Sequence, residues 1–184
     1  MKRILTLLLL TGLMSFQSPV KENPVPEEKN PIYNNFNEPI DFATINADHI
    51  KSATLSIQEK VNADIEKLVS IPDEKRTYEN TLLALDDLHA LFSDAFTTIY
   101  LLSNTHSDSL IRNTALESRV TLAKFDNEIS LNEDLYKAVK AFSATDEAQK
   151  LKGSQAKYWK ETIEEYERNG FALSPDKREK LKEI

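Results

Sequence analysis

Hydrophobic residues recur every three or four positions along most of the chain from Ile50 onwards, which is the spacing of one face of an α-helix. Three long stripes and one short stripe follow this pattern. They comprise Ile50, Ala53, Ile57, Val61, Ile65 and Leu68; Leu82, Leu85, Leu88, Phe92, Ala95, Ile99 and Leu102; Ile111, Ala115, Ser118, Leu122, Phe125 and Ile129; and Leu135, Val139 and Phe142. The spacing therefore predicts four helices that pack through these faces.

The ends of the first two stripes carry helix signals. Pro72 cannot continue a helix, so the first helix should stop before it. Thr77 is suited to cap the second helix by accepting a hydrogen bond from the backbone N–H of Asn80. Residues 73–152 contain neither Gly nor Pro, whereas a β protein of that length would need several turns. The chain is therefore predicted to be all-α.

The third and fourth helices are bounded in the same way. A polar turn is expected over residues 104–109, where Ser107 or Asp108 can cap the third helix. Asn132 should cap the fourth helix, with two acidic residues in its first turn.

A further stripe consists of Trp159, Ile163 and Tyr166. Its helix should stop at Gly170, which suits a left-handed C-cap followed by an apolar residue. Residues 174–176 then have the order of a helix start, with a capping hydroxyl, a proline and an acid. Together these signals predict an antiparallel, bundle-like domain of about five to six helices after an extended N-terminal segment.

Residues 1–17 have the pattern of a signal peptide. Lys2 and Arg3 precede an apolar run of 11 residues, 4–14, which is too short to cross a bilayer comfortably. Residues 15–17 form the expected cleavage region, although Gln17 is an unfavourable residue for it. An uncleaved anchor and a buried core segment are the alternatives. We expect the chain to be exported, to the periplasm or out of the cell, without a stable membrane anchor.

Five of the seven prolines lie before residue 40. Each proline removes a backbone donor and restricts the residue before it, so residues 18–40 are predicted to form an extended linker. The helical domain is predicted to span residues 41–184. Its last helix has no capping signal before Ile184, so we expect the domain to be truncated at its C-terminal end.

Composition narrows the classes of function. The chain has 23 basic and 30 acidic residues, for a net charge of −7, and no basic block. This balance argues against nucleic acid as a partner. The absence of cysteine removes a disulfide framework, a thiolate zinc site, a cysteine nucleophile and a lipoprotein anchor.

Side chains capable of chemistry are few and scattered. His49, His89 and His106 are never three or four residues apart, so no helix presents two imidazoles to one metal ion. The adjacent pairs Asp86-Asp87 and Glu164-Glu165 diverge by about 100° around a helix and do not share one site. We interpret all of these residues as structural or solvated.

Two other groups of residues are candidate sites. Ser103 and Ser107 lie near His106, but no glycines form a nucleophile elbow around them. Tyr158 and Trp159, beside two lysines, could form a stacking platform, whereas the helical spacing of Trp159 favours a place in the core. The residues themselves thus indicate no catalytic, cofactor-binding or metal-binding site.

Five strings, taken in order, resemble the N-terminal region of one enzyme family. One of them is Thr77-Tyr78-Glu79-Asn80-Thr81, at the expected head of the second helix and within a longer match over 76–86. The others occupy residues 39–45, 99–106, 128–136 and 166–173. Together they resemble the thimet oligopeptidase and dipeptidyl carboxypeptidase family of zinc metallopeptidases, over about residues 34–184.

The resemblance implies that these helices form one wall of a deep channel that admits short peptides. The family's opposite wall carries zinc on an H-E-x-x-H helix, and this sequence contains no such motif. No catalytic, cofactor-binding or metal-binding residue is therefore carried over, and zinc belongs to a C-terminal catalytic domain that would be the partner of this chain. We expect the N-terminal part of an exported zinc-dependent oligopeptidase, inactive alone. The alternative is a free-standing, non-enzymatic helical module that binds peptides or proteins.

Overall fold

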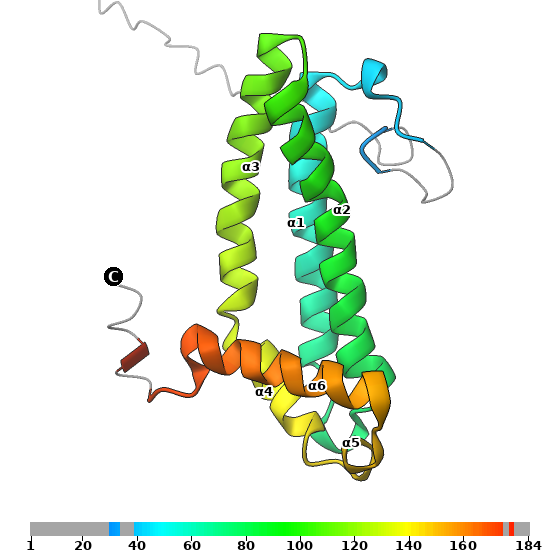
Figure 1. Cartoon of the computed structure of the whole chain (residues 1–184), viewed down its shortest axis with the longest axis vertical. Helices are drawn as coiled ribbons and strands as arrows, with labels where there is room; N and C mark the ends of the chain where they lie inside the picture. Colours follow the sequence, from blue (N-terminus) through cyan, green and yellow to red (C-terminus); the bar gives the residue numbers. More distant parts are fainter. Residues whose placement is uncertain (1–29, 34–38, 175–176, 179–184) are drawn as a thin grey trace, which may run out of the picture.

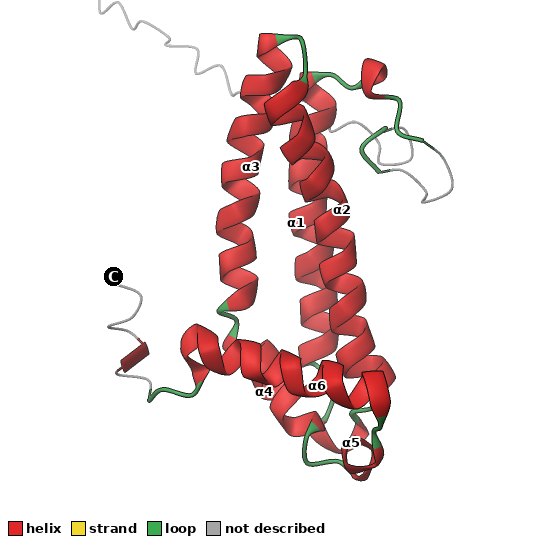
Figure 2. Cartoon of the chain, in the orientation of Figure 1, coloured by secondary structure: helices red, strands yellow, loops and turns green. Residues whose placement is uncertain are grey.

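A computed structural model describes residues 30–33, 39–174 and 177–178. In these ranges the chain forms six α-helices, joined by short 3-10 and π turns, and no strand (Figure 2). The all-α prediction is confirmed, and so is the number of about five to six helices.

Three long helices form an antiparallel bundle (Figure 1). They are α1 (Ala47–Val69), α2 (Ala84–Thr105) and α3 (Ser109–Ser130), at the positions that the stripes predicted. Every residue of the three long stripes is buried, and the core is mainly aliphatic, with Phe92 and Phe125 among its aromatic members. Removal of these side chains from water is the main driving force for the bundle.

Polar contacts hold the start of α1. The Asn46 side chain accepts from the backbone N–H of His49 (2.9 Å), and His49 Nδ1 accepts from that of Asn46 (3.3 Å). Within the predicted linker, residues 30–33 form a turn packed against this helix. There the buried Asn30 amide donates to the His49 carbonyl oxygen (2.8 Å), and the Tyr33 hydroxyl donates to a carbonyl of α1 (2.7 Å).

The connection between α1 and α2 contains a wide turn that the sequence analysis did not predict. After the 3-10 turn η3 (Asp73–Lys75), the second helix starts at Thr77, as predicted. Its first turn, η4 (Tyr78–Leu83), is a π turn, whose hydrogen bonds span one more residue than those of an α-helix. The chain then continues directly into α2.

The turn between α2 and α3 is shorter than predicted. Asn104 and Thr105 belong to α2, and their side chains donate to carbonyl oxygens four residues back (2.7 and 2.9 Å). These are local contacts from a side chain to the backbone of the same helix, and they keep polar residues that were expected in a turn within α2. Of the two predicted caps for α3, Asp108 rather than Ser107 takes the role, accepting from a first-turn N–H (2.7 Å).

The next two helices lie at the lower end of the bundle in Figure 1. α4 (Glu133–Phe142) starts at the predicted cap Asn132. α5 (Asp146–Lys150) was missed, because it is only five residues long and buries a single apolar side chain, Ala148, so it leaves no stripe in the sequence.

α6 (Gly153–Tyr166) crosses the lower ends of α2 and α3 in Figure 1. A π turn, η5 (Glu167–Phe171), carries the chain onward from its end. Gly170 has a φ of 106°, the left-handed backbone that its sequence context predicts. A side chain at this position would be strained, which explains why the turn uses glycine.

Some predictions lie outside the described residues. These are the signal peptide over 1–17, most of the linker over 18–40, and most of the last helix. Of that helix, Lys177 and Arg178 are described; both are helical and donate to the Ser174 carbonyl oxygen. No described helix is both long enough and apolar enough to cross a membrane.

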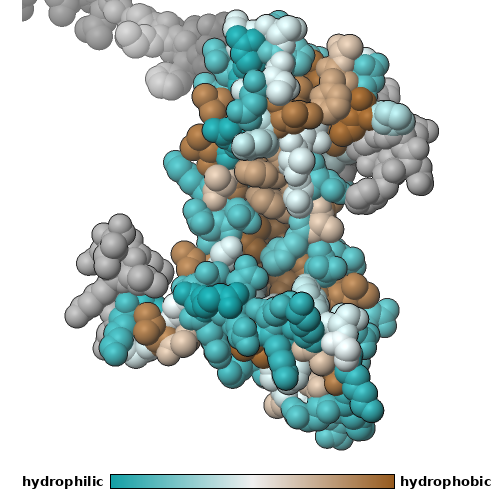
Figure 3. Space-filling model, viewed as in Figure 1, coloured by the Kyte–Doolittle hydropathy of each residue, from teal (hydrophilic) through white to brown (hydrophobic). Residues whose placement is uncertain are grey.

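The two halves of the molecule have different surfaces (Figure 3). Hydrophobic residues reach the surface between the long helices, whereas the face where α6 crosses is mostly hydrophilic. On α3, Leu116 and Val120 are close to half exposed, four residues apart on the side of the helix away from the core.

Candidate functional site

The three histidines lie on separate elements and do not form a metal site. His49 Nδ1 accepts from the Asn46 backbone, as described above, and His106 Nδ1 accepts from the backbone N–H of Asp108 (3.1 Å). His89 is exposed on α2. In residues 30–33, 39–174 and 177–178, no three His, Asp or Glu side chains are close enough to hold a metal ion. These residues therefore do not fit zinc.

Ser103, one of the two serines near His106, makes hydrogen bonds to its own helix and to the neighbouring α3. Ser103 Oγ donates to the Tyr100 carbonyl oxygen (2.7 Å) and receives a long hydrogen bond from Arg119 (3.4 Å). The Arg119 guanidinium also lies over the Tyr100 ring, 5.3 Å from its centre. No hydrogen bond between the described atoms joins Ser103 or Ser107 to His106, so the structure shows no activated nucleophile there.

Trp159 packs against the core and does not form a surface platform for stacking. It is half-buried against the core, and its Nε1 donates to Ser143 Oγ (3.0 Å), which joins α6 to the end of α4. Tyr158 is also half-buried, and the neighbouring Lys157 pairs with Glu161 (3.6 Å). Trp159 and Lys157 are therefore both engaged with other residues of the chain, which favours packing over a stacking platform.

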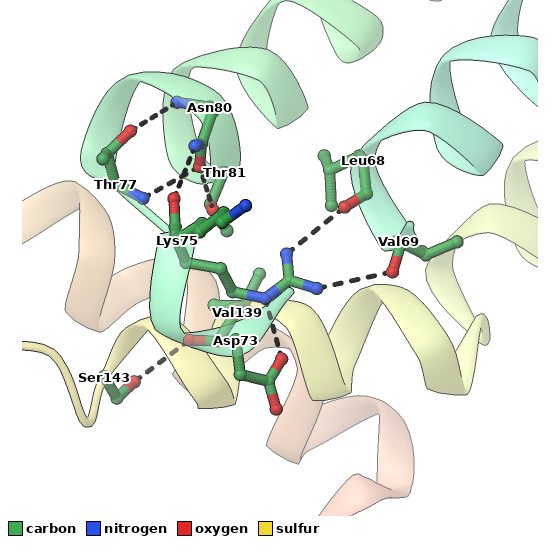
Figure 4. A network of polar contacts seen from close by, with 10 residues as sticks. Leu68, Val69, Asp73, Lys75, Thr77, Asn80, Thr81, Val139 and Ser143 are labelled. Atoms are coloured by element: carbon green, nitrogen blue, oxygen red, sulfur yellow. Dashed lines mark hydrogen bonds and ion pairs between the residues drawn. The ribbon is translucent and has the colours of Figure 1, made fainter. Parts of the chain in front are cut away.

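The Thr77-to-Thr81 string forms a compact network of hydrogen bonds at the head of the second helix (Figure 4). Thr77 Oγ1 accepts from the backbone N–H of Asn80 (3.1 Å), as predicted, and the Asn80 side chain accepts from the backbone N–H of Thr77 (2.8 Å). The Asn80 amide also donates to the Lys75 carbonyl oxygen (2.9 Å), and Thr81 donates to Asn80 Oδ1 (2.9 Å). The string thus fixes the start of the wide turn.

Arg76, next to that string, is buried and caps the preceding helix. Its guanidinium donates to the carbonyl oxygens of Leu68 and Val69 (3.3 and 3.5 Å), at the C-terminal end of α1, and to the Asp73 carboxylate (3.1 Å). The last carbonyls of a helix have no partner within it, and a cation there also interacts favourably with the helix dipole. Arg76 and the adjacent string therefore tie the end of α1 to the start of α2.

Polar side chains from three helices and η5 line a small cleft of about 110 Å³. It lies where α6 passes the start of α2 and the end of α3. The lining residues are Asp86, His89, Ser130, Tyr158, Thr162, Glu165, Tyr166 and Asn169. At one side of it, the Asn169 amide makes a long contact with the Ser130 carbonyl oxygen (3.5 Å). The fold brings together one member of each acidic pair, which the sequence analysis had treated as separate surface.

The two tyrosines of the cleft are held in their neutral form. Burial, and after it the Asp86 carboxylate, raises the pKa of Tyr158 to about 12. Burial also raises the pKa of Tyr166 far above its ordinary value, with smaller contributions from Glu165 and Tyr158. At neutral pH the cleft therefore combines two carboxylates with two protonated phenols.

Sequence reasoning could have found part of this arrangement. Arg76 stands between a helix stop at Pro72 and a helix cap at Thr77, where free carbonyls are expected, and that position is a signal for capping. The cleft left no such signal, because Asp86 and Tyr158 are 72 positions apart in sequence and meet only through the path of α6.

The sequence has a relative of named function. It is 34% identical, over 141 residues, to a thimet-like oligopeptidase from Dictyostelium discoideum, and the alignment covers 73% of this chain. This chain belongs to the thimet oligopeptidase family. The family resemblance inferred from the five strings is confirmed by this identity.

The match covers most of this chain but only a small part of the thimet-like oligopeptidase. It covers only 20% of the relative, so this chain spans about a fifth of a thimet-like oligopeptidase. No family model matches the chain. Within this fifth, the described residues supply a helical scaffold and a polar cleft.

Proposed function

We propose that this chain forms the N-terminal, channel-wall part of an exported zinc-dependent oligopeptidase that hydrolyses short peptides. The observation that supports this most strongly is the identity to a thimet-like oligopeptidase, which extends over most of this chain and only a fifth of the relative. Under the proposal, this helical piece is a structural part of a larger enzyme.

The chemistry of the described residues supports the same division. Their histidines serve as backbone caps or lie exposed, and no set of them fits zinc. Under the proposal, the metal and its general base belong to the C-terminal catalytic domain. This chain's own role is to present a rigid wall, made of three long helices and the crossing α6, that shapes the space open to peptides.

We also propose the domain organisation predicted from the sequence. Residues 1–17 direct export and are removed, residues 18–40 lead into the domain, and residues 41–184 form it. The support is the apolar run over residues 4–14 behind two basic residues. Mass spectrometry of the protein recovered from the periplasm or medium tests this: a new N-terminus after residue 17 is expected, and an intact Met1 in the cytoplasmic fraction contradicts it.

The decisive experiment compares this chain with the product of the coding sequence extended beyond Ile184. We expect the extended frame to contain H-E-x-x-H, to retain about one zinc per molecule and to cleave a quenched fluorescent peptide, with activity lost on chelation. The 184-residue chain alone should do neither. A natural stop codon after Ile184, with no rescue of peptidase activity by any added domain, would support the free-standing binding module and overturn the proposal.

A further inference from the structure

We propose that residues 30–33 act as a strap, a short segment that docks along α1 and fixes the N-terminal half of that helix. Asn30, Ile32 and Tyr33 make its contacts. The strap belongs to residues 18–40, which in the proposed function only lead into the domain. The inference therefore goes beyond the proposed function and does not depend on it.

Two side chains of the strap are buried as deeply as residues of the bundle core. Asn30 is 2% exposed and Ile32 is 3% exposed. Ile32 belongs to the same apolar cluster as Ile50 and Ile57 of α1. A segment that only connects two parts of a chain keeps its side chains in water, whereas the removal of Ile32 from water favours a docked position.

The Asn30 side chain both folds the strap and ties it to α1. Its Oδ1 accepts from the backbone N–H of Ile32 (3.1 Å), and the Asn30 carbonyl oxygen accepts from that of Tyr33 (3.0 Å), which closes the turn. Its Nδ2 donates to the His49 carbonyl oxygen (2.8 Å). A buried amide without partners would oppose docking, so these hydrogen bonds make one docked position specific.

Tyr33 extends the contact along α1. Its hydroxyl donates to the Ala53 carbonyl oxygen (2.7 Å), and Lys60 Nζ lies over its ring, 5.6 Å from the centre. From His49 to Lys60 the helix rises by about 16 Å, or roughly three turns. Both acceptor carbonyls lie within α1, where an oxygen that accepts from its own helix keeps a second lone pair. The strap therefore adds hydrogen bonds to α1 without removing any.

The strap is joined to the residues that start α1. The His49 carbonyl oxygen accepts from the strap, and the backbone N–H and ring of the same histidine pair with Asn46. Pro31 restricts the backbone of the strap, so docking loses less conformational entropy. We therefore expect a docked state and a released state of the strap. Release exposes Ile32 and loosens the first turns of α1 before the rest of the bundle, because those turns lose both the buried side chain and the two hydrogen bonds.

The test is hydrogen exchange of the full chain, followed by mass spectrometry. Asn30→Ala removes the donor to the His49 carbonyl oxygen, and Ile32→Ala removes the buried apolar side chain. In each variant the backbone amides of residues 50–60 should exchange about tenfold faster, because the released state is more populated. The amides of residues 111–129 in α3 should be unchanged. Unaltered exchange over residues 50–60, or an equal rise in both helices, would overturn the proposal.

Single polar changes separate the turn from its tie to α1. Asn30→Asp keeps the acceptor for the Ile32 backbone N–H but loses the amide donor, so it should raise exchange as Asn30→Ala does. Tyr33→Phe removes only the hydroxyl and should raise exchange over residues 50–60 about threefold. Tyr100→Phe, on a ring of α2 that is 51% exposed, is the matched control and should change nothing there. Full protection in Asn30→Asp would show that the amide does not hold the strap, and would overturn the proposal.

Nuclear magnetic resonance gives an independent measure of docking. In the parent chain we expect nuclear Overhauser contacts between the Tyr33 ring and the Lys60 side chain. Asn30→Ala should weaken these contacts and Tyr100→Phe should keep them, with circular dichroism to check that each variant retains its helices. Their absence from the parent chain would contradict the strap. None of these measurements needs peptidase activity or zinc, so a failure of the proposed function leaves the strap unaffected.

Discussion

The bundle of three long helices and the region around α6 are held together by different kinds of contact. Between α1, α2 and α3 the packing is mainly aliphatic, as at the fully buried Ile57, Ile99 and Leu122. Around α6 it depends on individual polar and aromatic contacts, such as the Trp159 hydrogen bond to Ser143 and the cluster of Tyr166 with neighbouring rings. Apolar area gives the bundle its free energy of unfolding, whereas the crossing region uses specific contacts to fix positions.

The largest expected effect lies in the aliphatic part. Leu122→Ala removes a fully buried side chain at the centre of α3 and should lower the free energy of unfolding by about 3 kcal/mol, from lost burial and the cavity left behind. Val120→Ala, on the exposed side of the same helix, is the control and should change it by less than about 0.5 kcal/mol. Urea unfolding measures both, and similar values for the two variants would contradict the assignment of the core.

Among the polar contacts, the largest effect is expected for the hydrogen bonds of Arg76. Arg76→Met keeps the aliphatic stem but removes the donor of the Val69 carbonyl oxygen and one of the donors of the Leu68 oxygen, and should cost about 2 kcal/mol. The Asp73 side chain is 76% exposed, so Asp73→Ala should cost little. If Asp73→Ala costs as much as Arg76→Met in urea unfolding, the ion pair rather than the helix cap is the stabilising contact.

A smaller loss is expected at the head of the second helix. Thr77→Ala removes the acceptor for the Asn80 backbone N–H and should lower the free energy of unfolding by about 1 kcal/mol. Thr77→Ser keeps that acceptor and should retain most of the stability. An unchanged melting temperature for Thr77→Ala would mean that the string serves a role other than capping.

The smallest effect concerns alkaline pH. The pKa of Tyr158 is raised from 10.0 to about 12, so its neutral form is favoured in the folded state. The stabilisation is complete below pH 10 and is lost as the pH rises from 10 towards 12, because the unfolded chain releases its proton first. Tyr158→Phe should therefore flatten the fall in stability over this range. Tyr166 acts in the same direction and keeps part of the slope, and a variant with the full parental slope contradicts the assignment.

The sequence predicted the aliphatic region well, because its contacts follow from spacing along one helix. Every stripe residue from Ile50 to Phe142 is buried, and the caps at Thr77 and Asn132 are where the polar residues indicate. These features depend on neighbours a few positions away. The π turn could not be predicted from such local signals, because a threonine at position 77 can cap an α turn and a π turn equally well.

The polar region was predicted less well, because its contacts join distant positions. Asp86 and Glu165 look like solvated members of acidic pairs until α6 crosses the start of α2. Asn30 looks like part of a proline-rich linker until its amide meets the His49 carbonyl oxygen. The spacing of residue types along the chain carries no information about contacts between distant positions. The candidate site was therefore found only from the fold.

The wide turn over Tyr78–Leu83 makes the molecule unusually tolerant of a change in chain length at one point. A deletion inside an α-helix rotates everything beyond it by about 100°, which would turn the apolar stripe of α2 away from its partners. A π turn already holds one residue more than an α turn needs. Loss of the exposed Leu83 could be absorbed by tightening this turn, with the stripe from Leu85 to Leu102 still facing inward. A one-residue deletion among relatives of this chain should therefore be accommodated here before anywhere else in the long helices.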